Sequence, residues 1–426
     1  MLILLGVIML VLLFMGYPMM VPLAVGTLFM MFTGMTFFGP DQAVTWMVTG
    51  VGSWVLAAVP MFIFAADILT KGHTANRLLD LVDAFSRHLR GGLPITTAAA
   101  CAVFGAVSGS TQATVVAMGG PMRPRLLAKG YPDSFALALI INASDIALLI
   151  PPSIGFIVYG VVMKTSIGDL FLAGILPGLL VLLMFSVYCW IGARIKGIEP
   201  EPRASWGERL TAVRRAILPM GFPVLVVGGI YGGWFSAVEA SAMAVAYALL
   251  LEVVIYRKVS IRDLGPLALS SGMITAVVFI LVAVGAAFSH TLGTANIPEK
   301  LLGPAIDAIG TNQVAALSLI AVAFFIGCMF VDPIVVILIL VPIFKPLIAS
   351  AHLDPVHVGV IVTLQAAIGS ATPPFGCDIF TAIAVFRRPY LDVIRGTPPF
   401  IFMLLVATFI LILFPQLSLW LPSFSH

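Results

Sequence analysis

The chain has 426 residues, of which 61% are hydrophobic and only 10% are charged. Soluble domains carry about 25% charged residues, so this composition excludes an ordinary soluble protein and indicates a protein of the lipid bilayer. The net charge of +3 comes without a basic patch, so no nucleic-acid partner is expected. The four cysteines lie far apart and lack metal-ligand spacing, which argues against a disulfide framework or a zinc site.

Apolar stretches about 20 residues long recur along the whole chain, and this is the length that a helix needs to cross the hydrocarbon layer. The first stretch lacks a charged leading segment and a small-residue cleavage site, so we expect a retained helix and not a signal peptide. Spans are predicted at residues 2–15, 19–38, 43–70, 132–163, 168–193, 216–235, 237–256, 268–290, 356–386 and 397–421.

The positive charges predict an orientation. With residues 71–92 in the cytoplasm, all but three of the 22 Lys and Arg residues fall on the cytoplasmic side, the exceptions being Lys164, Lys300 and Lys345. This bias agrees with the positive-inside rule. It requires two further apolar regions, 93–128 and 313–348, to enter and leave on the same side, so both are predicted to be re-entrant hairpins. Residues 75–91 have helically spaced apolar side chains and are predicted to lie along the cytoplasmic interface.

Two parts of the sequence share an uncommon order of features: a polar cluster, then prolines with basic residues, then a long apolar stretch with a proline pair. The first copy has SGST at 108–111, PMRPRL at 121–126 and LLIPPSIG at 148–155. The second has CMFVDP at 328–333, PIFKPL at 342–347 and SATPPFG at 370–376. The charge distribution gives the two copies opposite orientations. Inverted repeats of this kind are typical of secondary transporters.

Each proline pair predicts a broken helix. Pro151–Pro152 and Pro373–Pro374 remove backbone donors and push the preceding residue out of the α region. Regions 132–163 and 356–386 are therefore predicted to be pairs of half-helices with unwound turns near mid-membrane. Such backbone must be covered by protein or line a wet cavity, and the polar hairpin tips are the expected partners. Carbonyl and hydroxyl oxygens at such a junction suit Na⁺, while half-helix N-termini suit a carboxylate.

The polar side chains at the first tip are open to two interpretations. They are candidate ligands, or small residues that bond to their own helices and permit close packing. They are Ser108, Ser110, Thr111, Gln112 and Thr114.

Three acids lie in or beside apolar runs. Asp332 is a functional candidate and is also expected to cap the helix that Pro333 begins. Asp145 could tune an ion site, carry a proton or be a neutral packing residue. Glu239 is expected to cap a helix at a periplasmic turn. No arrangement of nucleophile and base is visible, so the chain is not expected to be an enzyme.

These motifs resemble the large membrane subunit of the tripartite ATP-independent periplasmic (TRAP) transporters, the DctM-like permeases, over essentially the whole chain. The resemblance rests on FGAVSGSTQATVVAMGGPM, LLIPPSIGFIVYG, GGWFSAVEASAMAVAYALL, GCMFVDPIVVILILVPI, DPVHVGVIV, SATPPFGCDIFTA and FPQLSLWLP. It implies an all-α polytopic protein of the bacterial cytoplasmic (inner) membrane, with an inverted repeat, two re-entrant hairpins and two broken helices in an elevator-type ion-transporter fold. It also implies two partners, a small four-helix membrane subunit and a soluble periplasmic substrate-binding protein that delivers an anionic solute.

The resemblance further implies two Na⁺ sites and a solute site between them. The first Na⁺ site would contain Ser108, Gly109, Ser110, Pro151 and Ser153; the second would contain Gly327, Phe330, Asp332, Gly369, Ser370 and Thr372. Solute is expected near Thr111, Gln112, Pro152, Pro373 and Pro374. Asp145 departs from the small or hydroxyl residue common in the family, which leaves the ligand set of the first site open.

The whole chain, 1–426, is expected to be one membrane domain. Scaffold elements are predicted at about 1–90 and 194–265, transport elements at about 91–193 and 313–396, and a last helix at 397–421. The predicted function is Na⁺-coupled uptake of a carboxylated solute, such as sialic acid, a C4-dicarboxylate or another sugar or organic acid, by an elevator movement. The alternative is a stand-alone Na⁺/carboxylate symporter or Na⁺/H⁺ antiporter of the same superfamily, with Asp145 and Asp332 as proton carriers.

Overall fold

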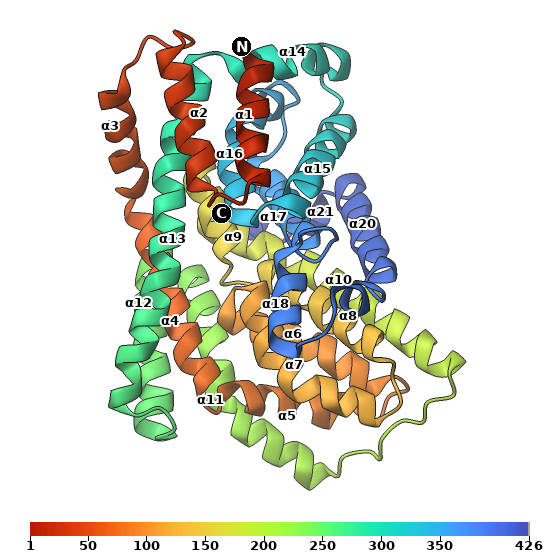
Figure 1. Ribbon diagram of the computed structural model, residues 1–426. Coiled ribbons are helices and arrows are strands. Elements are labelled where there is room, and N and C mark those ends of the chain that lie inside the picture. The colour runs from red at the N-terminus through yellow and green to blue at the C-terminus, as the bar shows by residue number, and fades with distance from the viewer. Residues whose placement is uncertain (425–426) are drawn as a thin grey trace.

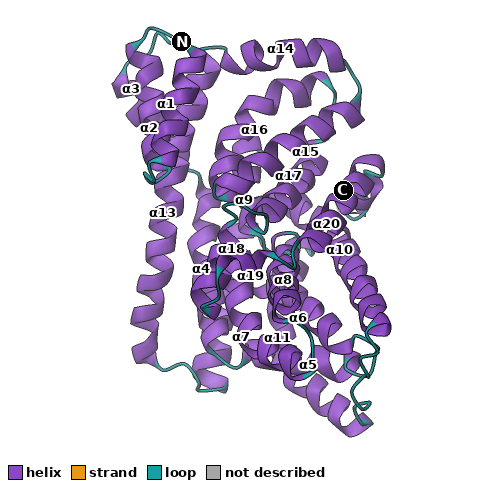
Figure 2. Cartoon of the chain, turned by 45° about the vertical axis from the view of Figure 1, so that its right-hand side comes forward, coloured by secondary structure: helices purple, strands orange, loops and turns teal. Residues whose placement is uncertain are grey.

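The computed structural model describes residues 1–424, and over these residues the chain is helical, without a β-strand (Figures 1 and 2). The α-helices are α1 (Leu2–Phe14), α2 (Met20–Phe32), α3 (Pro40–Val51), α4 (Ala58–Lys71), α5 (Thr74–Ser86), α6 (Gly92–Ser108), α7 (Thr111–Ala128), α8 (Asp133–Ser144), α9 (Ile154–Met163), α10 (Ile167–Ile195), α11 (Trp206–Tyr231), α12 (Ala237–Leu249), α13 (Ile261–Thr294), α14 (Ile297–Ile309), α15 (Gln313–Phe330), α16 (Pro333–Ser350), α17 (Pro355–Ser370), α18 (Cys377–Phe386), α19 (Tyr390–Ile394), α20 (Pro398–Leu413) and α21 (Gln416–Leu419). Short helical turns are η1 (Trp54–Ala57), η2 (Asp145–Leu148), η3 (Leu250–Ile255) and η4 (Pro422–Phe424).

The predicted inverted repeat is confirmed in the order of the helices. The first copy consists of an amphipathic helix α5, the hairpin α6–α7, the broken helix α8–α9 and the long helix α10. The second copy repeats this order with α14, α15–α16, α17–α18 and α20. Helices α5 and α14 lie at opposite ends of the molecule, while α9, α17 and α18 lie between them (Figure 1). The sequence analysis missed α14, the counterpart of the predicted interface helix.

The two broken helices are covered by protein, as their exposed backbone requires. Every residue of α17 from His357 to Ser370 is buried, and so is every residue of α8 from Ala136 to Ser144. Helix α17 packs against α15, α10, α16 and α20, and α8 packs against α6 and α7. Unsatisfied peptide groups in lipid cost several kcal/mol, by general estimates. The first interruption is therefore buried, whereas the second turn is partly exposed at Pro373 and Pro374.

A long helix supports the other half of the molecule. Helix α13 has 34 residues, which corresponds to about 51 Å at 1.5 Å per residue. It packs against α2, α3, α4 and α16. Seven helical segments are long and apolar enough to cross a membrane within the described part of the chain: Trp54–Lys71, Ile167–Ile195, Trp206–Tyr231, Ala237–Ile255, Ile261–Thr294, Gln313–Phe330 and Pro333–Ser350. The last two are the hairpin helices, which meet this criterion by length and composition only.

Four predicted spans need correction. Region 43–70 is not one helix, because α3 ends at Val51 and the chain continues through Gly52 and η1 into α4. Helices α1 and α2 have 13 residues each, about 20 Å, which is shorter than the roughly 30 Å hydrocarbon core. Region 397–421 is divided, because α20 ends at Leu413 and α21 follows. Mean hydropathy does not report where a helix ends, although Gly52–Ser53 and Pro415–Gln416 stand at two of these breaks in the sequence.

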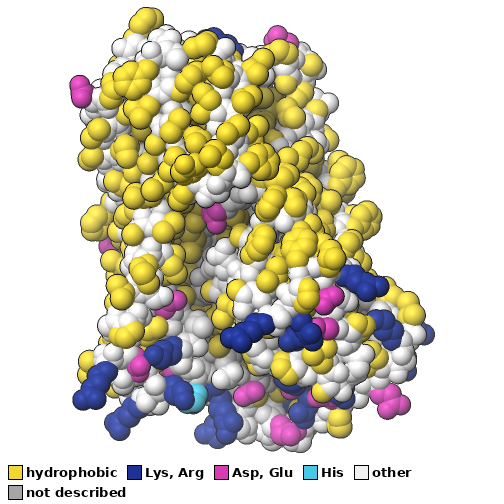
Figure 3. Space-filling view, viewed as in Figure 1, with side chains coloured by type: hydrophobic (Ala, Val, Ile, Leu, Met, Phe, Trp, Pro, Cys, Tyr) yellow, Lys and Arg dark blue, Asp and Glu magenta, His cyan; other side chains and the backbone are white. Residues whose placement is uncertain are grey.

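Charged side chains gather at one end of the molecule. In the view of Figure 3, Lys and Arg cluster at the lower end, where α5 and the start of α11 lie, and hydrophobic side chains cover the upper part. Salt bridges at this end join Arg87 to Glu208 and Arg125 to Asp83. Glu252, fully buried, accepts hydrogen bonds from the backbone N–H groups of His73 and Thr74 and so holds the start of α5. The end of the molecule that contains α5 and the start of α11 is therefore the charged surface that the sequence predicts to face the cytoplasm.

This orientation can be tested with single accessible cysteines. Arg214→Cys in α11 lies on the predicted cytoplasmic side, and Lys300→Cys in α14 lies on the predicted periplasmic side; both positions are exposed. We expect a membrane-impermeant maleimide to label Lys300→Cys in intact cells and Arg214→Cys only after permeabilisation. The parent chain controls for its own four cysteines, three of which are buried. The reverse labelling pattern would contradict the orientation.

Candidate functional site

The first hairpin tip meets the unwound turn of its own repeat. Helix α6 ends at Ser108, Gly109 adopts a left-handed conformation with φ of +60°, and Ser110 caps α7. The Gly109 carbonyl oxygen accepts a hydrogen bond from the Ile154 backbone N–H at 3.5 Å. A side chain on Gly109 would place its Cβ 2.3 Å from the Pro152 carbonyl oxygen. The structure therefore brings the tip and the turn together as predicted.

The second hairpin tip meets its turn in the same way. The Phe375 backbone N–H donates to the Met329 carbonyl oxygen at 3.1 Å. Helices α15 and α17 approach so closely that a Cβ on Gly369 would lie 2.3 Å from the Cβ of Cys328. Asp332 caps α16 by accepting from the Ile334 backbone N–H at 2.9 Å, so the capping prediction is confirmed. Both proline pairs, Pro151–Pro152 and Pro373–Pro374, are joined by cis peptide bonds.

Helix ends of both polarities meet at these junctions. Helices α6 and α15 end at the tips, α17 ends at the second unwound turn, and α8 continues through η2 to the first. Some of their last carbonyl oxygens accept from the backbone that follows, as Gly327 does from Val331 and Gly369 from Thr372. Helices α7, α9, α16 and α18 begin there and present their first N–H groups. The partial charges at helix C-termini attract cations and those at N-termini attract anions. The arrangement can thus hold a cation beside an anion without a formal charge from the protein.

Side chains at the first tip bond mainly to the tip itself. The Ser108 hydroxyl lies 3.0 Å from that of Thr114, and the Thr114 hydroxyl donates to the Ser110 carbonyl oxygen at 2.8 Å. Ser153, across the junction, caps α9 by accepting from the Phe156 backbone N–H at 3.4 Å. The hydroxyls of this site therefore bond to one another and to the local backbone, and so fix the shape of the tip.

Asp145 lies at the start of η2, next to the first unwound turn, and its side chain is 1% exposed. Neither of its carboxylate oxygens has a hydrogen-bond partner among the described residues. None of the six ion pairs within residues 1–424 includes Asp145, Asp332 or Asp378. The centre of the molecule therefore carries acids without basic partners. Glu239, by contrast, forms a capping box with Ser236, as predicted.

Asp378 is the residue that sequence analysis missed. Its side chain is fully buried and accepts hydrogen bonds from the Thr111 hydroxyl at 2.8 Å and the Ser370 hydroxyl at 2.6 Å. Thr111 is the first residue of α7 in the first repeat, and Ser370 is the last residue of α17 in the second. The usable signal was an acid inside an apolar segment, which is a functional candidate by default.

The remaining predicted solute residues flank this bridge at the surface. Gln112 follows Thr111 in α7 and is partly exposed, as are Pro373 and Pro374 in the second turn. Phe330 and Phe375 lie beside them with ring centroids 6.0 Å apart, and their side chains are 40% and 50% exposed. These residues form one continuous surface over the second junction. Pro152 is buried under the first tip and is separate from this surface.

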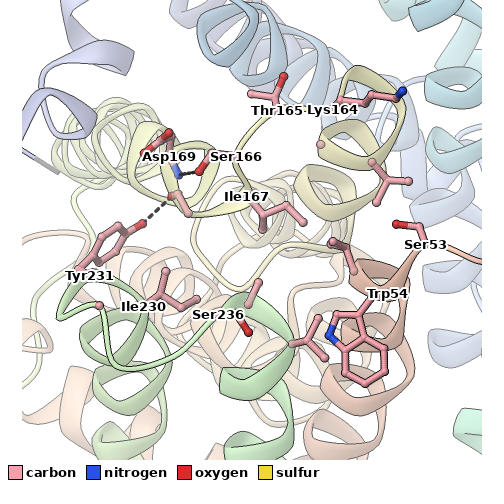
Figure 4. A pocket seen from close by; sticks show the side chains of 17 residues that line it. Ser53, Trp54, Lys164, Thr165, Ser166, Ile167, Asp169, Ile230, Tyr231 and Ser236 are labelled. Atoms are coloured by element: carbon pink, nitrogen blue, oxygen red, sulfur yellow. Dashed lines mark hydrogen bonds between the residues drawn. The ribbon is translucent and has the colours of Figure 1, made fainter. Parts of the chain in front are cut away.

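A pocket of about 700 Å³ lies where the connection from α9 to α10 meets η1 and the turn between α11 and α12 (Figure 4). Tyr231 donates from its hydroxyl to the Gly168 carbonyl oxygen at 2.8 Å across this boundary. The pocket contains none of the residues predicted to bind Na⁺ or solute. It lies between a predicted scaffold part and a predicted transport part, and it marks their boundary.

Comparisons with known proteins agree with this geometry. The family model of the tripartite ATP-independent periplasmic transporter, DctM component, matches residues 6–417. The chain is 58% identical over 420 residues to the ectoine TRAP transporter large permease protein TeaC of Halomonas elongata, covering 97% of both chains. It is 59% identical over 419 residues to the ectoine/5-hydroxyectoine TRAP transporter large permease protein UehC of Ruegeria pomeroyi, covering 98% of this chain and 97% of that one.

A solved structure shares the fold. The YdaH transporter of Alcanivorax borkumensis, whose crystal structure is described as revealing an unusual topology, aligns with a TM-score of 0.61. The alignment covers 90% of this chain and 88% of that chain at 14% sequence identity. At this identity the likeness concerns the fold alone.

The close contact at the first tip predicts that adding one methyl group at Gly109 destabilises the protein. Gly109→Ala should lower the free energy of unfolding by at least about 1–2 kcal/mol, because alanine disfavours the left-handed conformation and its Cβ collides with Pro152. Gly120→Ala, in the same hairpin, is the matched control, because nothing lies within 4 Å of its Cβ. Thermal unfolding of the two purified variants gives the comparison. Equal midpoints of thermal unfolding in the two variants would show that the protein's stability does not depend on the close approach of Gly109 to Pro152.

Proposed function

Because the chain belongs to the DctM family, the large permease subunits of tripartite ATP-independent periplasmic transporters, we propose that it performs Na⁺-coupled uptake of ectoine or a closely similar zwitterionic solute. Membership of this family makes the chain a multi-pass inner-membrane permease for secondary uptake of organic solutes, and not an enzyme. Permeases of this family act with a small membrane subunit and a periplasmic binding protein. The solute, the ion and the movement are the parts that we propose.

The choice of solute rests on the two relatives that match nearly the full chain and are named for ectoine. Ectoine is a cyclic amidine that carries a carboxylate, so it has a positive and a negative group near neutral pH. The half-helix N-termini at the tips supply N–H groups for a carboxylate. The unpaired central acids favour a solute that also carries positive charge. These acids disfavour a C4-dicarboxylate or sialic acid, which carry negative charge only.

The proposed coupling ion fits the oxygen-rich junctions. Na⁺ is a hard cation, and the four helix C-termini at the tips and turns present carbonyl oxygens toward the junctions. The solute would bind over Thr111, Gln112 and Phe375, next to the second junction. We propose that the two hairpins and broken helices move together against α3, α4, α11, α12 and α13, with the pocket at Tyr231 lying on the sliding boundary.

Uptake by the complete transporter tests the proposal. Proteoliposomes with this chain and its small subunit, supplied with the cognate binding protein, should take up labelled ectoine in an inward Na⁺ gradient and not in a matched K⁺ gradient. Labelled succinate should be taken up at least tenfold more slowly, because it lacks a cationic group, and tenfold corresponds to about 1.4 kcal/mol. Ectoine uptake that is indifferent to Na⁺ and to the binding protein would refute the proposal. A proton-driven cation flux without solute would instead support an antiporter.

The first Na⁺ site predicts a change in ion dependence. Ser108→Ala and Ser110→Ala should raise the Na⁺ concentration for half-maximal uptake severalfold, up to about tenfold for a loss of 1.4 kcal/mol, since both hydroxyls shape the tip. Ser318→Ala, whose hydroxyl bonds only to its own helix at Val314, is the control. Unchanged Na⁺ activation in both tip variants at normal expression would exclude a side-chain role for these serines.

A further inference from the structure

One carboxylate joins the two repeats at their functional ends. Asp378 accepts from the Thr111 hydroxyl at 2.8 Å through Oδ1 and from the Ser370 hydroxyl at 2.6 Å through Oδ2. All three side chains are at most 5% exposed. Hydrogen bonds to an ionised carboxylate are about twice as strong as those between neutral groups. The bridge therefore fixes two hydroxyls that belong to different proposed sites, one for solute and one for Na⁺.

The bridge is present in one repeat only. Asp378 stands five residues after Pro373, and the residue five after Pro151 in the other repeat is Phe156, which is also fully buried. The first broken helix thus forms with an aromatic residue at this position. The fold of a broken helix therefore does not require a carboxylate at the position of Asp378, because Phe156 occupies the matching position in the first repeat.

A purely structural acid in this chain looks different. Glu252 is also fully buried and accepts from the Thr74 hydroxyl at 2.6 Å, but it accepts as well from the backbone N–H groups of His73 and Thr74 at the start of α5. The donors to Asp378 are two side-chain hydroxyls, and neither is a helix cap donor. A hydroxyl has one proton, and that of Ser370 is within reach of both Asp378 at 2.6 Å and the Ala367 carbonyl oxygen at 2.7 Å. When the hydroxyls donate to Asp378, the oxygen lone pairs of Thr111 and Ser370 are left for another partner. Those lone pairs suit Na⁺ or a donor group of the solute.

We propose that Asp378 is a positioning residue that couples Na⁺ binding at Ser370 to solute binding at Thr111. This inference rests on the proposed Na⁺-coupled uptake. When Na⁺ binds the Ser370 oxygen, the shared carboxylate orients the Thr111 hydroxyl, and solute binding acts on Ser370 through the same carboxylate. Coupling of this kind is reciprocal for equilibrium binding. Asp145 lies close enough to Asp378 for electrostatic interaction and has no hydrogen-bond partner among the described residues.

Equilibrium binding of labelled ectoine to the purified full chain with its small subunit tests the proposal. The quantity to measure is the ratio of the ectoine Kd without Na⁺ to that at saturating Na⁺. In the wild type this ratio should lie between about 5 and 150, the usual range for coupled sites. Asp378→Asn keeps the size of the side chain but cannot accept from both hydroxyls, and the ratio should fall toward 1. Asp307→Asn, an exposed acid on α14, should keep the wild-type ratio.

Two single variants keep the test decisive if Asp378→Asn does not fold. Thr111→Val removes the hydroxyl at the proposed solute site, yet it should raise the Na⁺ concentration that half-maximally promotes ectoine binding. Ser370→Ala should weaken ectoine binding at saturating Na⁺. The effects of the two substitutions should be non-additive in the double variant, because both act through one carboxylate. A structural brace would lower stability and leave the Kd ratio unchanged.

The outcomes separate this inference from the proposed function. A wild-type ratio well above 1 that persists in Asp378→Asn overturns the bridge and leaves Na⁺ coupling intact. A wild-type ratio near 1 overturns both. Additive effects of Thr111→Val and Ser370→Ala also overturn the bridge, since independent sites add within a few tenths of a kcal/mol.

Discussion

The constraint on which this structure depends is the cost of broken backbone in hydrocarbon. Two proline pairs interrupt helices within apolar segments, so their free peptide groups must be covered by protein or line a water-filled cavity. Helices α8 and α17 satisfy this condition by being buried along almost their whole lengths. The hairpins α6–α7 and α15–α16 then close each junction, and Gly109 and Gly369 permit the approach that a side chain would block. The burial of α8 and α17 and the close packing of the hairpin tips therefore serve the same purpose, which is to satisfy the free backbone groups of the broken helices.

The arrangement of hairpins and broken helices also determines where the helix ends lie. Every interruption creates one C-terminus and one N-terminus, and two hairpins with two broken helices bring four of each to the centre. Partial charges from the backbone suffice to attract an ion and a carboxylate. The side-chain hydroxyls of the first tip are used to hold its shape, through Ser108, Thr114 and the Ser110 carbonyl. The proposed ion sites would thus be a property of the fold, whereas side chains would determine which solute accompanies the ion.

Local signals predicted the parts of this arrangement that are local. The proline pairs predicted the breaks, the charge bias predicted the hairpins, and an acid before Pro333 predicted a helix cap. Helix α14 escaped notice because Ile297–Ile309 is short and contains charged residues and prolines, so it gives no span-length apolar signal. The break between α3 and α4 lies at Gly52 and Ser53, a short turn signal that the high hydropathy of region 43–70 outweighed. Asp378 was missed because its main partner, Thr111, lies 267 residues away in sequence.

The inverted repeat separates what the two copies share from what each adds. Shared features are the tips, the turns and the helix ends, and these are the features that suit Na⁺ in both halves. Asp378 and Asp145 have no acidic counterpart at the matching positions, since Phe156 corresponds to the first and Ala367 to the second when both are counted from the proline pairs. A solute is not symmetric, so its recognition must depend on residues that break the symmetry. The unmatched acids are therefore where this permease differs from a carrier built only of backbone ion sites, and they lie between the two junctions where ion and solute must act on each other.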